Sequence, residues 1–169
     1  MGLTIHYEGH LKNAAAYDEL IQVCLAFSDK EGWPAEMIDE PHRSEERVID
    51  EEVIPYEGPM CGIRLYPDPD CEPLTFEFGT DLFGQDWTKT QFAGPIIHRK
   101  VVALLSNLER LFADLSVIDE SDYWTDRDEP ALDEAFRRAD EAINEAFLQY
   151  PGGTCKVKTP DGRFIDIIT

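Results

Sequence analysis

Two histidines and a glutamate alternate near the start of the chain, at His6, Glu8 and His10. The apolar residues Ile5 and Tyr7 lie between them, which is the period-two pattern of a β-strand. Two imidazoles and a carboxylate on one strand face are a competent ligand set for zinc or another divalent ion. The sequence therefore predicts a metal site on this face. The alternative is an ordinary solvated strand face.

Cationic and hydrogen-bonding side chains gather around the start of a helix that we predict from Pro95. The free N–H groups of a helix start attract anions, and cationic side chains beside them strengthen the binding. The predicted ligand-binding residues here are Lys89, Thr90, Gln91, His98 and Arg99. The alternative is that Lys89 pairs with a neighbouring carboxylate, which a chain this acidic supplies in abundance.

An acidic turn contains Asp68, Asp70 and Glu72. Hard oxygen ligands at this density could hold calcium or magnesium. The turn lacks the glycine and the spacing of an EF-hand loop, and Pro69 limits how it can wrap an ion. The alternative is a solvated acidic turn.

A second acidic group surrounds Tyr123 and Trp124 and consists of Asp119, Glu120, Asp122, Asp126 and Asp128. Carboxylates beside an aromatic ring could perform acid–base chemistry on a sugar-like substrate. We therefore add Glu120 and Trp124 to the predicted ligand-binding residues. The alternative is that these acids cap a third helix, because a helix dipole favours negative charge at its start.

The chain carries no GxxxxGK[ST], GxGxxG or GxSxG motif, so no nucleotide, cofactor or nucleophile is assigned. Its four cysteines include no CxxC pair. We interpret them as reduced thiols of a cytoplasmic protein, with a Cys61–Cys71 bridge as the alternative.

The charge of the chain is strongly negative, with 35 acidic and 15 basic residues and a formal net charge of −20. The charge is uneven: residues 36–60 carry −7 and residues 113–149 carry −9, while residues 87–112 carry +3. A negative surface repels phosphate backbones and anionic lipids, which argues against nucleic-acid and membrane binding. It is suited either to solubility alone or to a basic protein partner.

The elements that position these residues follow from periodicity. Apolar stripes with helical period predict helices over 14–30, from Pro95 to about 112, and from about 129 to 150. Alternating runs predict strands over 47–56, 61–66 and 74–78, a short strand LSVID, and a C-terminal hairpin turning at 159–162. Residues 36–44 are expected to be irregular. This order predicts one α+β domain over 1–169, a mainly antiparallel sheet with about three helices packed on it.

Short motifs across most of the chain resemble those of an uncharacterised bacterial family. They are TIHYEGHLK near the start, CEPLTFEF over 71–78, KTQFAG over 89–94 followed by His98, and DESDYW over 119–124. The resemblance implies a complete bacterial domain. No activity is associated with the family, so it implies no catalytic residue.

Two functions are consistent with these observations. The first is an acidic binding or interaction domain that meets a basic protein partner. The second is an enzyme or binding protein for a small anionic ligand, with a pocket at the start of the second helix and Glu72 or Glu120 as a base. The sequence leaves open whether the protein is an enzyme.

Overall fold

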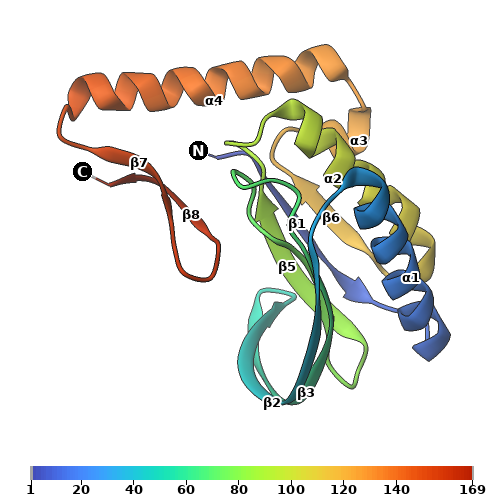
Figure 1. Cartoon of the computed structure of the whole chain (residues 1–169). Helices are drawn as coiled ribbons and strands as arrows, with labels where there is room; N and C mark the ends of the chain where they lie inside the picture. The colour runs from blue at the N-terminus through green and yellow to red at the C-terminus, as the bar shows by residue number, and fades with distance from the viewer. Residues whose placement is uncertain (1, 169) are drawn as a thin grey trace.

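The computed structural model describes residues 2–168, with backbone alone at 167 and 168. Its elements confirm the predicted α+β class, with strands paired antiparallel (Figure 1). In chain order they are β1 (Thr4–His10), α1 (Ala14–Glu31), β2 (Ala35–Ile49), β3 (Glu52–Leu65), β4 (Leu74–Phe78), β5 (Phe83–Lys89), α2 (Pro95–Leu108), a 3-10 turn (Glu109–Leu111), β6 (Ser116–Asp119), α3 (Tyr123–Asp126), α4 (Glu129–Gln149), β7 (Thr154–Lys158) and β8 (Phe164–Ile168).

The central sheet has the strand order β5-β1-β6. Ile5 pairs with Thr88 on one side and with Asp119 on the other. Ile5 and Tyr7 are buried in the main core, whereas His6 on the opposite face of β1 is exposed. Helices α1 and α2 cover the buried face (Figure 1). The other face of the sheet is therefore free to border a binding site.

Helices α1 and α2 match their predicted positions because their ends are encoded locally. Asn13 accepts a hydrogen bond from the N–H of Ala16 at 2.9 Å, and Gly32 ends α1 with φ of 71°. Pro95 occupies the first turn of α2, where no intrahelical N–H is needed. The apolar stripe of α2 is fully buried against α1 and the sheet.

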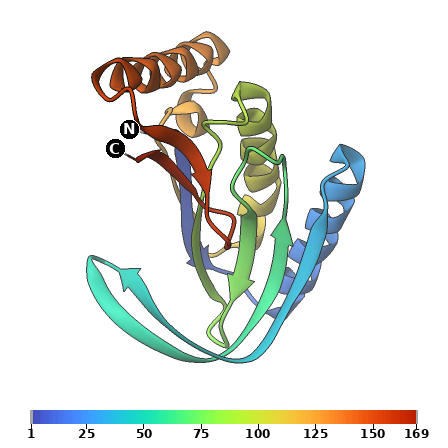
Figure 2. The ribbon, with the colours of Figure 1, turned by 60° about the vertical axis from the view of Figure 1, so that its left-hand side comes forward.

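Strands β2 and β3 form a long hairpin, which we call the arm (residues 35–65). The arm curves away from the helices (Figure 2). Two predictions were wrong here: residues 36–44 are strand, and the single strand expected over 47–56 is a hairpin that turns at Asp50 and Glu51. Both turn residues have positive φ, 50° and 66°, as a tight type I′ turn requires. Because β2 has polar side chains on both faces, its sequence lacks the apolar–polar alternation that predicts a strand.

The C-terminal part consists of α4 and a separate two-stranded sheet, β7–β8, which we call the tail hairpin (residues 154–168). Asp128 caps α4, and Leu132 and Phe136 are its buried residues. Figure 1 shows the tail hairpin hanging from the far end of α4 beside the central sheet. The predicted third helix and terminal hairpin are confirmed. Strand β5 was not predicted, because Gly84, Gln85 and Asp86 interrupt its apolar pattern.

Among the described residues, no helix is long and apolar enough to cross a membrane.

Candidate functional site

The three predicted metal ligands lie along one face of β1, but each contacts a different neighbouring side chain. His10 Nδ1 lies 2.8 Å from a carboxylate oxygen of Asp114, and Glu8 accepts a hydrogen bond from Gln85. His6 Nε2 is 4.0 Å from Glu120. Within residues 2–168, no group of three or more His, Cys, Asp or Glu side chains is arranged to hold a metal ion. The structure does not bring these three residues together as a ligand set.

His98 lies inside the core at 0% exposure. Its Nδ1 is 2.7 Å from Thr90 Oγ1, and its Nε2 is 3.0 Å from Asp119 and 3.1 Å from Ser121 Oγ. Burial of Asp119 opposes ionisation, but the hydrogen bond and charge of His98 outweigh it and hold the pKa of Asp119 below its ordinary value. Asp119 also accepts the N–H of Trp124 at 2.9 Å. These residues tie α2, β5 and β6 together rather than facing a ligand.

The two cations of the predicted anion site are already paired with carboxylates, whereas the buried Nε2 of Gln91 has no hydrogen-bond partner among the described residues. Lys89 Nζ is 2.8 Å from Asp166, and Arg99 lies 3.6 Å from Asp133. The side chain of Gln91 is buried and accepts the N–H of Leu3 at 3.3 Å. The alternative weighed from the sequence, that carboxylates neutralise these cations, is the arrangement observed.

Glu120 and Trp124 are the remaining predicted binding residues. Glu120 accepts the N–H of Thr4 at 2.9 Å and holds the end of β6 against β1. The Trp124 ring packs against the main core, with the Arg127 guanidinium 4.9 Å from its centre. None of the residues of the predicted anion site lines the cleft of about 680 Å³ or the cavity of about 130 Å³ that the described residues form.

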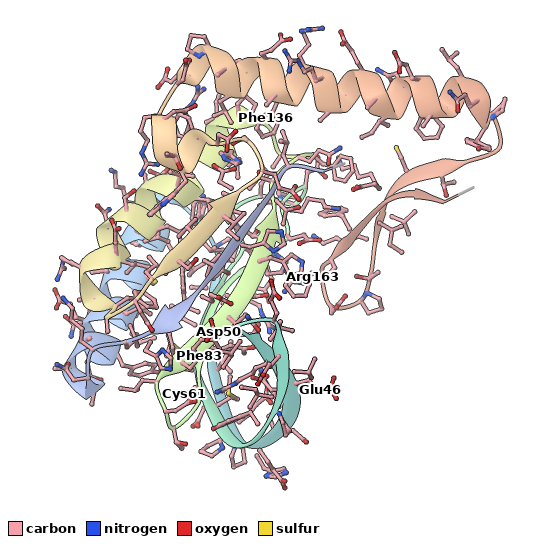
Figure 3. All side chains as sticks on the ribbon, turned by 180° about the vertical axis from the view of Figure 1, so that it is seen from behind. Glu46, Asp50, Cys61, Phe83, Phe136 and Arg163 are labelled. Atoms are coloured by element: carbon pink, nitrogen blue, oxygen red, sulfur yellow. The ribbon has the colours of Figure 1, made fainter. Side chains whose placement is uncertain are left out.

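A cleft of about 680 Å³ lies between the arm and the free face of the central sheet. We call it the acidic cleft, because five carboxylates line it: Glu8, Glu45, Glu46, Glu77 and Asp86. The sheet side also contributes His6, Gln85, Trp87, Ser116 and Ile118, and the arm contributes Arg47 and Val48. Figure 3 shows the arm, with Glu46 and Asp50 labelled, below the tail hairpin that carries Arg163.

Gln85 holds the arm over the sheet and so creates the cleft. Its Oε1 accepts the N–H of Val48 at 3.0 Å, and its Nε2 donates to the Val48 carbonyl at 2.6 Å. Arg47 anchors the same segment, with its guanidinium 3.8 Å from the centre of the Tyr56 ring and 2.8 Å from Asp81. The arm position is therefore fixed by specific side chains.

Charge in the acidic cleft is only partly neutralised. Arg47 pairs with Glu45 at 3.2 Å, and Arg43 pairs with Glu77 at 2.6 Å. Glu8 and Glu46 have no Lys or Arg partner among the residues that the structure describes. Trp87 and Ile118 expose 46% and 65% of their surface beside these carboxylates. The cleft thus combines free negative charge with exposed apolar area.

Arg163 of the tail hairpin reaches the end of the cleft where Asp86 lies. Its guanidinium is 2.5 Å from Asp86, 3.2 Å from Glu72 and 4.3 Å from the centre of the Trp87 ring. Burial raises the pKa of Asp86, and the positive charge of Arg163 opposes that rise. A second cavity of about 130 Å³ is lined by Arg163, Asp86 and Glu77, so it adjoins the cleft at these carboxylates.

Glu72, predicted as a metal ligand or a base, has a structural position in this network. It is 2% exposed and accepts hydrogen bonds from the N–H groups of Lys89 at 3.1 Å and Phe164 at 2.8 Å. Asp70, from the same turn, pairs with Lys156 at 2.5 Å. The acidic turn therefore serves as the docking surface of the tail hairpin.

Two sequence features pointed to this region: the charge of −7 over residues 36–60, which includes Glu45 and Glu46, and the polar strand face with His6 and Glu8. No sequence feature pointed to Asp86 and Trp87, because strand β5 was not predicted. The approach of Arg163 to these residues depends on the path of α4 back across the molecule, which local patterns do not encode.

No protein-family model, no curated protein and no solved structure matches the chain. The resemblance to an uncharacterised bacterial family therefore stays a prediction.

Proposed function

We propose that the protein is an interaction domain whose acidic cleft binds a basic, extended segment of a partner protein. The observation that carries this proposal is the cleft itself, about 680 Å³ in volume and lined by five carboxylates beside an exposed tryptophan. Such a surface attracts Lys and Arg side chains and offers apolar area for their methylene stems. The carboxylates of Glu8 and Glu46, which have no Lys or Arg partner among the described residues, would provide the long-range attraction.

We further propose that this interaction takes place in the cytoplasm of a bacterium. The four cysteines are among the described residues and are free thiols. Cys24 and Cys71 are buried, and burial raises the pKa of each to about 12, so neither is a reactive thiolate at neutral pH. Unreactive free thiols fit a reducing compartment.

Calorimetric titration with a basic peptide tests the proposal. The probe is an acetylated and amidated peptide of alternating glycine and lysine. We expect binding that weakens as salt rises from about 30 to about 300 mM, because exposed charges are screened over this range. Replacing these two carboxylates, E8Q with E46Q, should lower affinity about three- to thirtyfold, at up to about 1 kcal/mol for each exposed pair.

The matched control is D140N with E145Q, which removes two charges from the exposed face of α4. It makes the same change in net charge and should leave affinity nearly unchanged. If the cleft variant and the control bind the peptide equally well, or if the parent protein does not bind it, the acidic cleft is not the interaction site.

A further inference from the structure

The tail hairpin contacts the rest of the molecule without joining either of its larger sheets. Strands β7 and β8 pair with each other, and within residues 2–168 no ladder connects them to β5. The hairpin is held by side chains: Phe164 packs on Phe92 with ring centres 5.5 Å apart, Lys156 pairs with Asp70, and Arg163 enters the carboxylates beside the cleft. An element attached in this way can separate without breaking a β-sheet.

The surroundings of Arg163 are those expected of a bound arginine from another molecule. Its planar guanidinium lies on the Trp87 ring, donates to the Trp87 carbonyl at 2.5 Å and pairs with two carboxylates on different elements, Glu72 and Asp86. Stacking and several directed hydrogen bonds are the means by which proteins distinguish arginine from lysine. The chain therefore contains a formed arginine subsite, filled by its own residue.

The acidic cleft continues into this subsite. Asp86 and Trp87 line the cleft, and Asp86 also contacts Arg163. A basic segment lying in the cleft would bring its side chains next to the guanidinium of Arg163. Exchange of one arginine for another keeps Asp86 and Glu72 paired, so it avoids the large penalty of leaving buried carboxylates without a partner.

We propose that the tail hairpin is a resident competitor: Arg163 occupies the arginine subsite of the acidic cleft, and an arginine of the basic partner displaces it and releases the hairpin. This inference rests on the proposed function. It specifies arginine as the residue that the partner must supply and the tail hairpin as the element that regulates access.

Calorimetry with two peptides tests the competition. One peptide alternates glycine with arginine, and the other alternates glycine with lysine. The variant R163Q vacates the subsite, so we expect affinity for the arginine peptide to rise at least fivefold and to rise more than affinity for the lysine peptide. The control R137Q changes net charge equally on exposed α4, where Arg137 pairs with Glu134 at 2.5 Å, and should raise neither affinity comparably.

Amide hydrogen exchange of the parent protein tests the same proposal without a variant, in case R163Q does not fold. With saturating arginine peptide, the amides of β7 and β8 should exchange faster, while those of buried α2 stay protected. Unchanged or slower exchange in the hairpin overturns the proposal, as does an R163Q variant that folds and gains no affinity for the arginine peptide. If the peptides bind but the hairpin exchange does not rise and R163Q gains no affinity, the interaction function stands and the role of the tail hairpin as competitor fails. If neither peptide binds the parent protein, both proposals fail.

Discussion

The start of α2 and the acidic cleft draw on two of the three charged segments of the sequence, residues 87–112 and residues 36–60, and they differ in how their charges are used. At the start of α2, Lys89 pairs with Asp166 and Arg99 lies near Asp133. In the acidic cleft, Glu8 and Glu46 have no Lys or Arg partner among the described residues. The cations at the start of α2 are therefore neutralised by internal ion pairs, whereas these two carboxylates of the cleft remain available to a partner.

The difference follows from the excess of acids over bases. With 35 acidic and 15 basic residues, a cationic side chain is rarely far from a carboxylate, whereas many carboxylates must remain unpaired. A run of basic residues in such a chain is therefore a weak indication of an anion site. The informative feature is a place where unpaired carboxylates surround a cavity.

The substitution expected to change stability most removes the carboxylate that pairs with His98 of α2. Replacing Asp119 with alanine leaves buried His98 without its partner and removes the acceptor for the N–H of Trp124. We expect the free energy of unfolding to fall by about 3–5 kcal/mol, the usual loss when one member of a buried pair is removed. Urea denaturation measures this loss, and D140A on exposed α4 is the control. A loss below about 1 kcal/mol would show that this network is not structural.

Lowering the pH should also weaken the Asp119–His98 pair, with a smaller effect on the free energy of unfolding than removal of Asp119. The pKa of Asp119 is lower in the folded protein than in the unfolded chain, where it is about 3.9. The unfolded state therefore binds more protons, and the stabilisation from Asp119 is complete above about pH 4 and is lost as pH falls through the lowered folded pKa. We expect D119N to show a shallower loss of stability than the parent protein below about pH 4, measured by urea denaturation across pH. Identical pH dependence in the two proteins would contradict the assignment.

The smallest expected effect is the absence of specific anion binding at the start of α2. Phosphate at about 10 mM stabilises proteins generally, because it is excluded from their surfaces. Since Lys89 is already paired with Asp166, we expect the parent protein and K89A to show the same phosphate-induced shift in melting temperature, within about 1 °C by calorimetry. A shift about 3 °C larger in the parent protein would show that phosphate binds specifically at Lys89.

Local periodicity correctly predicted the helices and strands that bury one face in the core and expose the other. The apolar stripe of α2 and the alternation of Ile5 and Tyr7 place residues in the core, so their spacing is readable. The arm was mispredicted because β2 exposes polar residues on both faces, and strand β5 was missed because its sequence FGQDWTK mixes burial and exposure. A periodic apolar pattern arises where a strand or helix packs one face against a core, and these strands make little such contact.

The candidate site was less predictable than the fold, because its parts come from distant segments. Glu46 lies on the arm, Trp87 on the central sheet and Arg163 on the tail hairpin. Each residue alone has an ordinary surface explanation. Their convergence depends on strand pairing and on the path of α4, neither of which is present in a window of neighbouring residues.

The central position of β1 has a consequence for how the chain folds as it is synthesised. Leu3 bonds to Gln91, 88 positions later, and Thr4 bonds to Glu120, 116 positions later. At about 5–20 residues per second, the ribosome needs roughly 6–23 s to make the last of these partners after β1 has formed. Both edges of β1 are unpaired until β5 is made, and one edge stays unpaired until β6 is made, a state prone to association with other strands. The first strand to be made is thus the last in its sheet to be completed, and a chain arrested before β6 would expose it to chaperones.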